Sequence, residues 1–179
     1  MLEERRKVIS DSIRVVPHFP KEGIMFQDIT TLLLNPIAFQ YSIEDFVEQY
    51  RDQQVEVVAG FEARGFIFGP PIALALHCPF VPLRKPGKLP GETVSAEYQL
   101  EYGSDKIEMS VGAVKKGQRV LLIDDLIATG GTLAAGVKLM KQVGGEVIGA
   151  GCVIELPELN GRENLKGTPL YIQVEKEGV

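Results

Sequence analysis

Apolar runs alternate with mixed segments along most of this 179-residue chain. The runs at 55–60, 79–83 and 119–125 are rich in Val, Ile and Leu, which is typical of buried strands. Helical patterns follow the first run, in GFIFGPPIALAL, and the third, over 131–142, and another strand is expected from residue 146. Strand–helix–strand order favours parallel pairing. The pattern therefore predicts an α/β fold with a central, mainly parallel sheet flanked by helices.

The N-terminal third is predicted to be largely helical. Apolar residues at helical spacing indicate an amphipathic helix over 2–16, and a second helix is expected from Pro36 to near Asp52, with Asn35 as its cap. The segment between them, IMFQDITTLLL, is β-branched at first and leucine-rich later, so strand and helix both remain open.

Prolines and glycines are frequent after Leu83, and two β-prone runs follow, separated by Tyr102-Gly103-Ser104-Asp105. This pattern predicts a long loop and then a projecting hairpin. The closing PLYIQVEKEGV is expected to supply a last strand before a polar tail. A chain of this length predicts one domain.

Composition narrows the function classes. Lys and Arg total 19 against 24 Asp and Glu, so the net charge of -5 argues against non-specific nucleic-acid binding. No apolar run approaches the roughly 20 residues of a membrane span, and the opening lacks a signal-peptide pattern, so we expect a cytoplasmic protein without membrane contact. Cys78 and Cys152 show no metal-ligand spacing and are predicted to be buried thiols.

The segment VLLIDDLIATGGT carries the most chemical information. Its strand ends on Asp124 and Asp125, and ligands of parallel sheets bind beyond the carboxyl ends of strands. Ala128, Thr129, Gly130 and Gly131 then lead into a helix whose unpaired amides favour an anion, and Thr132 adds a hydroxyl donor. A ribose 5-phosphate suits both the carboxylates and the turn. A plain strand-to-helix turn with an Asp cap is the alternative.

Neither common nucleotide motif is present. The chain has no GxxxxGK[ST] sequence, and Gly60, Gly65 and Gly69 do not form GxGxxG. Phosphate-loop NTPase and Rossmann interpretations are therefore disfavoured.

VLLIDDLIATGGT resembles the phosphoribosyl pyrophosphate motif of type I phosphoribosyltransferases. The segments GIMFQDITTLL, AGFEARGFIFG, VPLRKPGKLPG, LEYG and VIELPELNGR resemble, in the same order, those of adenine phosphoribosyltransferases, and FQDITTLL is similar to plant members. The similarity covers about residues 12–165. It implies the type I phosphoribosyltransferase fold over 1–179, with an N-terminal cap at 1–34 and a flexible hairpin lid at 91–112.

The resemblance implies transfer of ribose 5-phosphate from phosphoribosyl pyrophosphate to N9 of adenine, giving AMP and pyrophosphate. Asp124 and Asp125 would hold the ribose hydroxyls, and the turn from Ala128 to Thr132 would bind the 5-phosphate. Mg²⁺ would be bound mainly through the substrate, with no metal site of the protein's own. The cations expected at the departing pyrophosphate are Arg64, Arg84, Lys85 and Lys88.

Other roles implied by the resemblance concern the lid, the base and the oligomer. Glu101 would act as acid or base toward adenine, and Tyr102 would lie beside it at the lid tip. The backbone of Met25, Phe26 and Gln27 would read the base, although many relatives have arginine in place of Gln27. The arginine corresponding to Arg84 is expected to reach a neighbouring subunit, which implies a homodimer.

Two kinds of alternative remain open. The acceptor could be another base, hypoxanthine/guanine or orotate, or the chain could be a non-catalytic regulator that binds phosphoribosyl pyrophosphate.

His18 and His77 lack suitably spaced partners and are expected to be structural or surface residues. Asp28 and Glu155 lie within apolar segments and would need polar partners if buried.

Overall fold

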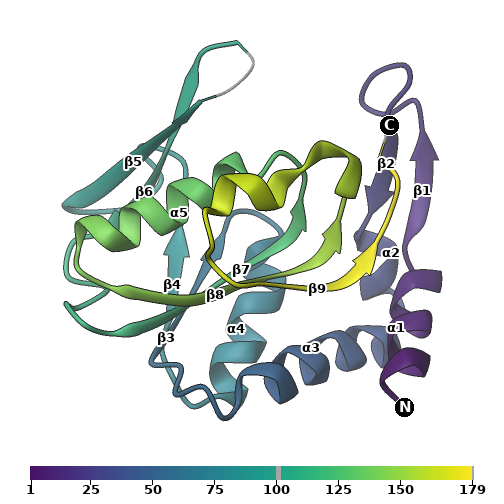
Figure 1. The fold of residues 1–179 in the computed structure, drawn as a ribbon, viewed down its shortest axis with the longest axis horizontal. Helices are drawn as coiled ribbons and strands as arrows, with labels where there is room; N and C mark the ends of the chain where they lie inside the picture. The colour runs from purple at the N-terminus through teal and green to yellow at the C-terminus, as the bar shows by residue number, and fades with distance from the viewer. Residues whose placement is uncertain (100–101, 179) are drawn as a thin grey trace.

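The computed structural model describes residues 1–99 and 102–178, and a parallel sheet with strand order β4-β3-β7-β8-β9 forms its centre (Figure 1). All neighbouring strands of this sheet pair in parallel. The strands are β3 (Val57–Phe61), β4 (Phe80–Leu83), β7 (Arg119–Ile127), β8 (Glu146–Glu155) and β9 (Leu170–Glu175). The predicted class, a central parallel sheet flanked by helices, is confirmed.

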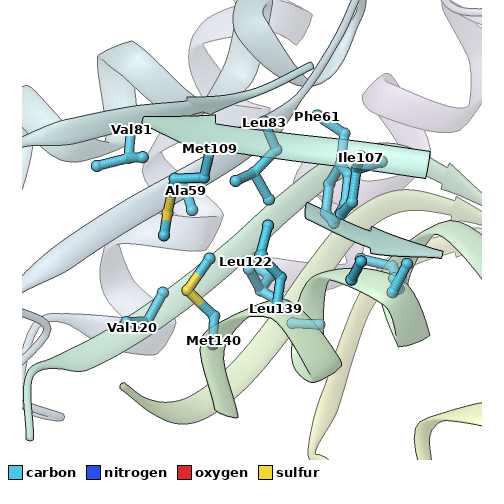
Figure 2. Close-up of a cluster of buried hydrophobic side chains, with 14 of the residues drawn as sticks. Ala59, Phe61, Val81, Leu83, Ile107, Met109, Val120, Leu122, Leu139 and Met140 are labelled. Carbon is cyan, nitrogen blue, oxygen red and sulfur yellow. The ribbon is translucent and has the colours of Figure 1, made fainter. Parts of the chain in front are cut away.

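Helices cover both faces of the sheet. Since successive residues of a strand point to opposite faces, each strand contributes side chains to both layers. Val120 and Leu122 of β7 pack in the layer that contains α5 and the hairpin residue Met109, as Figure 2 shows. Leu121 and Ile123 pack in the opposite layer, which contains α1, α3 and α4. The helical elements are α1 (Leu2–Asp11), α2 (Thr30–Leu33), α3 (Pro36–Tyr50), α4 (Gly65–Ala75), α5 (Gly131–Gln142) and the 3-10 turns η1 (Pro157–Leu159) and η2 (Gly161–Leu165).

The N-terminal segment departs from the predicted helix over 2–16. Helix α1 ends at Asp11, and β1 (Arg14–Pro17) pairs antiparallel with β2 (Met25–Asp28). The segment IMFQDITTLLL, which the sequence left open between strand and helix, contains both, because β2 is followed by the short helix α2.

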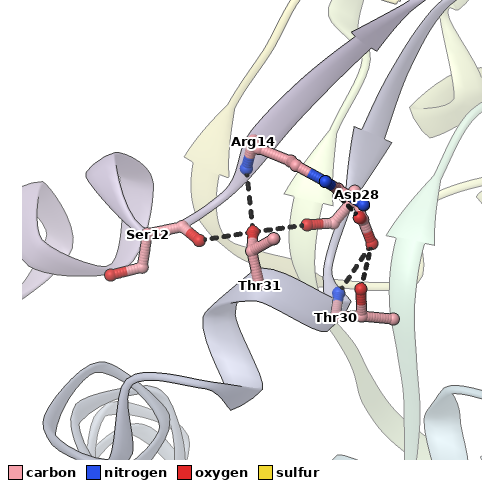
Figure 3. Close-up of polar contacts among 5 residues, drawn as sticks. All are labelled: Ser12, Arg14, Asp28, Thr30 and Thr31. Atoms are coloured by element: carbon pink, nitrogen blue, oxygen red, sulfur yellow. Dashed lines mark hydrogen bonds and ion pairs between the residues drawn. The ribbon is translucent and has the colours of Figure 1, made fainter.

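Polar contacts around Thr31 stabilise this early end of the helix (Figure 3). The Thr31 hydroxyl donates to the carbonyl oxygen of Ser12 at 2.7 Å and accepts from the Arg14 amide at 3.0 Å. The Arg14 guanidinium donates to Asp28 at 2.7 Å, and the Thr30 hydroxyl donates to the same carboxylate at 2.5 Å. The Thr30 hydroxyl, followed by Arg14, holds the pKa of Asp28 below its ordinary value. Asp28 thus has the partners that its burial requires.

The predicted hairpin is present as β5 (Thr93–Gln99) and β6 (Ser104–Ser110), which pair antiparallel and project from the body (Figure 1). Its β6 strand is joined to the end of β4, because the backbones of Arg84 and Glu108 exchange hydrogen bonds of 3.0 and 2.7 Å. Glu101, the predicted acid or base, lies outside the described residues.

The remaining predictions concern thiols, histidines and membrane contact. Cys152 is a buried free thiol as predicted, whereas Cys78 is only half-buried because it follows α4 near the surface. His18 and His77 are exposed surface residues. Within residues 1–99 and 102–178, no helix has both the length and the apolar character that crossing a bilayer requires.

Candidate active site

A cavity of about 340 Å³ opens at the carboxyl end of β7, where the strand turns into α5. The turn places Gly130 in the left-handed region at a φ of 81°, a conformation that glycine adopts without steric cost. Helix α5 begins at Gly131, so its first amides have no partner within the helix. The turn therefore offers hydrogen-bond donors and the positive end of a helix dipole to an anion.

Asp124 and Asp125 line this cavity with Arg64. The Arg64 Nε donates to Asp125 at 2.5 Å, and the Asp125 amide donates to the Asp124 carboxylate at 2.8 Å. Burial opposes the charge of Arg64, yet the Asp125 carboxylate outweighs it and raises the pKa of the guanidinium. The cation thus offsets one of the two adjacent negative charges.

The carboxyl of Asp124 has the least favourable surroundings in the cavity. Burial by protein atoms, followed by the charge of Asp125, raises its pKa well above the ordinary 3.8, although part of the residue is accessible. An ionised Asp124 therefore costs folding free energy. A ligand that donates hydroxyl groups or brings positive charge would relieve this cost.

Glu62 contacts two of the cations that line the cavity. Its carboxylate accepts from the Arg84 guanidinium at 3.1 Å and from the Lys85 amide. The Lys85 ammonium contacts Asp105 and donates to the Tyr98 hydroxyl at 2.7 Å, so the hairpin contacts this cation. Burial opposes the charge of Lys85, but Asp105 and Tyr98 raise its pKa above the ordinary value. Arg84 and Lys85 both line the cavity and are available to an anion that displaces these carboxylates.

Ten of the residues that the sequence singles out line this one cavity: Arg64, Arg84, Lys85, Asp124, Asp125, Ala128, Thr129, Gly130, Gly131 and Thr132. Lys88 does not, and its backbone carbonyl accepts from Arg84 at 3.3 Å. Tyr102 also lies apart and is 89% exposed.

The expected base-reading segment is separate from the cavity. Met25 and Gln27 line a second hollow together with Glu177, and Phe26 packs edge-on against Phe19. The Met25 amide donates to the carbonyl oxygen of Gly178 at 3.0 Å, and the Gln27 side-chain amide donates to that of Glu177 at 2.7 Å. Residues 177–178 therefore lie along the edge of β2.

Sequence reasoning did not identify the groups that partner the predicted residues. Glu62, Tyr98 and Asp105 hold the cations, and Asn164 donates to the carbonyl oxygen of Thr129 at 2.5 Å. Glu62 could have been found from the sequence, because it lies two residues before Arg64. The others approach the site from distant parts of the chain, and local spacing does not indicate this.

The described residues contain no group of three or more His, Cys, Asp or Glu side chains arranged to hold a metal ion. Two adjacent carboxylates in a cavity with cations fit a divalent ion that arrives with a phosphorylated ligand, because Mg²⁺ commonly combines one or two carboxylates with substrate phosphates.

Comparison with known proteins gives a consistent result. The family model described as phosphoribosyl transferase domain matches residues 30–167. Adenine phosphoribosyltransferase 3 of Arabidopsis thaliana is 65% identical over 167 residues, covering 93% of this chain and 91% of the relative. Adenine phosphoribosyltransferase of Nitrosomonas eutropha is 52% identical, covering 91% and 95% of the two chains.

Solved structures agree with the sequence comparison. Adenine phosphoribosyltransferase from Thermoanaerobacter pseudethanolicus superposes with a TM-score of 0.91 at 46% identity, covering 98% of this chain and 100% of the other. The Saccharomyces cerevisiae enzyme, complexed with an imino-altritol bisphosphate and adenine, gives 0.91 at 39% identity, covering 96% and 99%. The Trypanosoma brucei enzyme, in complex with AMP, pyrophosphate and ribose-5-phosphate, gives 0.88 at 30% identity, covering 96% and 79%.

The raised pKa of Asp124 predicts that Asp124→Asn is more stable than the unsubstituted protein at pH 7. Between the unfolded value near 3.8 and the raised folded value, the folded chain keeps a proton that the unfolded chain has released. Stability therefore falls as pH rises through this window, by at most about 1.4 kcal/mol per pH unit for one proton. Asparagine cannot ionise, so the variant lacks this loss.

Urea unfolding between pH 4 and pH 8 measures the effect. The advantage of Asp124→Asn should grow with pH, whereas the exposed control Asp52→Asn should change stability by less than about 0.5 kcal/mol throughout. A variant that is less stable at pH 8 than at pH 4, relative to the unsubstituted protein, would contradict the assignment.

Proposed function

The chain belongs to the adenine phosphoribosyltransferase family and transfers ribose 5-phosphate from phosphoribosyl pyrophosphate to N9 of adenine, giving AMP and pyrophosphate; we propose that the cavity beyond β7 is where it does so. The observation that carries this placement is the meeting of three features in one cavity. They are the open turn before α5, the carboxylates of Asp124 and Asp125, and the cations that line the same cavity.

Each feature matches one part of the donor substrate. The amides around Gly130 and the hydroxyls of Thr129 and Thr132 bind the 5-phosphate, and hydrogen bonds to such a charged group contribute about 1.5–3 kcal/mol each. Asp124 and Asp125 accept hydrogen bonds from the ribose hydroxyls. The sugar donors relieve the unfavourable surroundings of the Asp124 carboxylate.

The departing pyrophosphate binds to the cations that line the cavity. Arg64, Arg84 and Lys85 face the cavity, and each already holds a carboxylate partner in the chain. Pyrophosphate competes for these cations, and their charge stabilises the negative charge that develops as the glycosidic bond breaks. Lys88 joins these cations if the loop after β4 closes.

Mg²⁺ enters with the donor substrate in this proposal. The carboxylates of Asp124 and Asp125 are the groups of this chain that would face it, while substrate phosphate oxygens supply most ligands. When bound, the ion would neutralise phosphate charge and make pyrophosphate a better leaving group.

The base is bound next to β2. Backbone groups of Met25 and Gln27 read the edge of adenine, with Phe26 nearby, and the Met25 amide becomes available when the Gly178 carbonyl moves away. We assign residues 1–34 to a cap over the base and 91–112 to a lid, within one domain over 1–179. Glu101 exchanges a proton with adenine as the lid closes, and Tyr102 helps to exclude water.

The chain acts as a cytoplasmic homodimer in this proposal, and Arg84 exchanges Glu62 of its own chain for the pyrophosphate of the neighbouring site. The proposal involves neither nucleic acid nor a membrane.

Turnover with different bases tests the activity. Radiolabelled phosphoribosyl pyrophosphate supplied with adenine should yield AMP, and hypoxanthine, guanine and orotate should yield at least about 100-fold less nucleotide, because buried groups that pair with the base reject a mismatched one. Tight binding of the donor without any nucleotide formed would favour a regulator. Preference for an oxopurine would contradict adenine as acceptor.

The double substitution Asp124→Asn, Asp125→Asn should weaken binding of phosphoribosyl pyrophosphate by several kcal/mol, since each charged hydrogen bond lost contributes about 1.5–3 kcal/mol. Steady-state kinetics should show kcat/KM for phosphoribosyl pyrophosphate reduced by 100-fold or more. Asp52→Asn is the control. Unchanged kinetics in the double variant would place the ribose elsewhere.

Glu101→Gln should lower kcat by about 100-fold or more if the carboxyl transfers a proton, and its pH–rate profile should lose one limb. Glu97→Gln on the same hairpin makes the same charge change within β5 and outside the lining of the main cavity, so its kcat should stay within about twofold. An unchanged kcat and profile for Glu101→Gln would limit that residue to closing the site.

A further inference from the structure

The loop after β8, residues 157–166, packs on the outside of the turn at 128–131. None of its residues lines the main cavity, whereas the turn itself does. Asn164 instead lines a separate hollow beside α5. The loop therefore contacts the turn without lining the cavity, and Figure 1 shows the yellow-green 3-10 turns beside α5.

Asn164 sets the orientation of one peptide group in the turn. Its side-chain amide donates to the carbonyl oxygen of Thr129 at 2.5 Å. In a trans peptide the carbonyl and the following N–H point in opposite directions within one plane. Because the Thr129 carbonyl faces the loop, the amide of Gly130 points away from the loop.

Gly161 packs closely against the preceding peptide group. A Cβ on Gly161 would collide with the carbonyl oxygen of Ala128 and would lie 2.9 Å from a side-chain carbon of Ile127. A Cβ on Gly130 would in turn collide with the carbonyl oxygen of Gly161. The two backbones are in contact only because both positions are glycine. The Ala128 carbonyl thus lies next to Gly161, and the Thr129 amide points away from the loop.

The loop is itself anchored to the sheet. Glu155, at the end of β8 and 4% exposed, accepts from the Arg162 guanidinium at 2.6 and 2.7 Å in a bidentate pair. Leu165 is buried in the layer beneath α5, and the Leu156 amide donates to the Ile127 carbonyl at 3.1 Å. These contacts give Glu155 the partner that its burial requires, and they make the loop a fixed support.

We infer that Asn164 and Gly161 are positioning residues, which hold two successive peptide groups so that their amides converge on the 5-phosphate. This inference rests on the proposed placement of the phosphate at the turn. Neither residue touches substrate. They act by making the amides ready for the anion before it arrives, so that binding does not have to order the turn.

The test compares Asn164→Ala and Gly161→Ala with Glu163→Ala, an exposed neighbour in the same loop. Loss of one neutral hydrogen bond should raise KM for phosphoribosyl pyrophosphate and Kd for AMP about two- to tenfold in Asn164→Ala. Gly161→Ala should raise this KM and this Kd more than tenfold, because its Cβ would collide with the Ala128 carbonyl oxygen and displace the backbone of the turn. The KM for adenine and kcat should stay within about twofold in Asn164→Ala, since adenine carries no phosphate.

Two results would overturn the inference. The first is an AMP affinity of Asn164→Ala equal to that of Glu163→Ala. The second is an equal loss of affinity for AMP and for adenine, which would indicate general destabilisation. Should Gly161→Ala fail to fold, Asn164→Ala still decides. AMP titration of the Asp124→Asn, Asp125→Asn variant separates the two proposals. Unchanged AMP binding there would reject the cavity itself, whereas weakened binding there with a normal Asn164→Ala would reject only the positioning role.

Discussion

The parallel pairing of β7 between β3 and β8 is the constraint on which the site depends. Because the three strands run the same way, their carboxyl ends meet at one edge, and the turns that follow lie together. Asp124 and Asp125 follow the stretch Val120–Ile123 of β7, which is buried on both faces and fixes them at this edge. Arg64 follows β3 and reaches the same place. The cavity is thus a consequence of sheet topology before any ligand is considered.

Opposite charges within the chain explain how an acidic protein with a net charge of -5 keeps an anion site. The cations of the site are each paired with a carboxylate: Arg64 with Asp125, Arg84 with Glu62, and Lys85 with Asp105. Partly exposed pairs of this kind contribute little net stability. Their partners can therefore be exchanged for substrate phosphates at modest cost, while the chain avoids unpaired buried charge in the free state.

Much of the fold was predictable because local patterns agree with the final packing. The helix predicted over 131–142 coincides with α5, and Asn35 caps α3 by accepting from the amides of Ile37 and Ala38. The strand runs were found because burial on both faces produces continuous apolar sequence. The helix predicted over 2–16 was wrong beyond Asp11, because Thr31 and Asp28 stabilise an extended Arg14 and both come from later in the chain.

The sequence by itself determined the parallel architecture, the carboxylate pair and the glycine turn, because strand periodicity and turn chemistry are properties of neighbouring residues. Only the tertiary structure decided which groups face them. The ion pair of Arg64 with Asp125 joins residues 61 positions apart, and the contact of Asn164 with Thr129 spans 35. Such contacts form when folding brings together segments that are distant in the sequence, so the spacing of neighbouring residues does not predict them. Folding likewise places the backbone of residues 177–178 along β2.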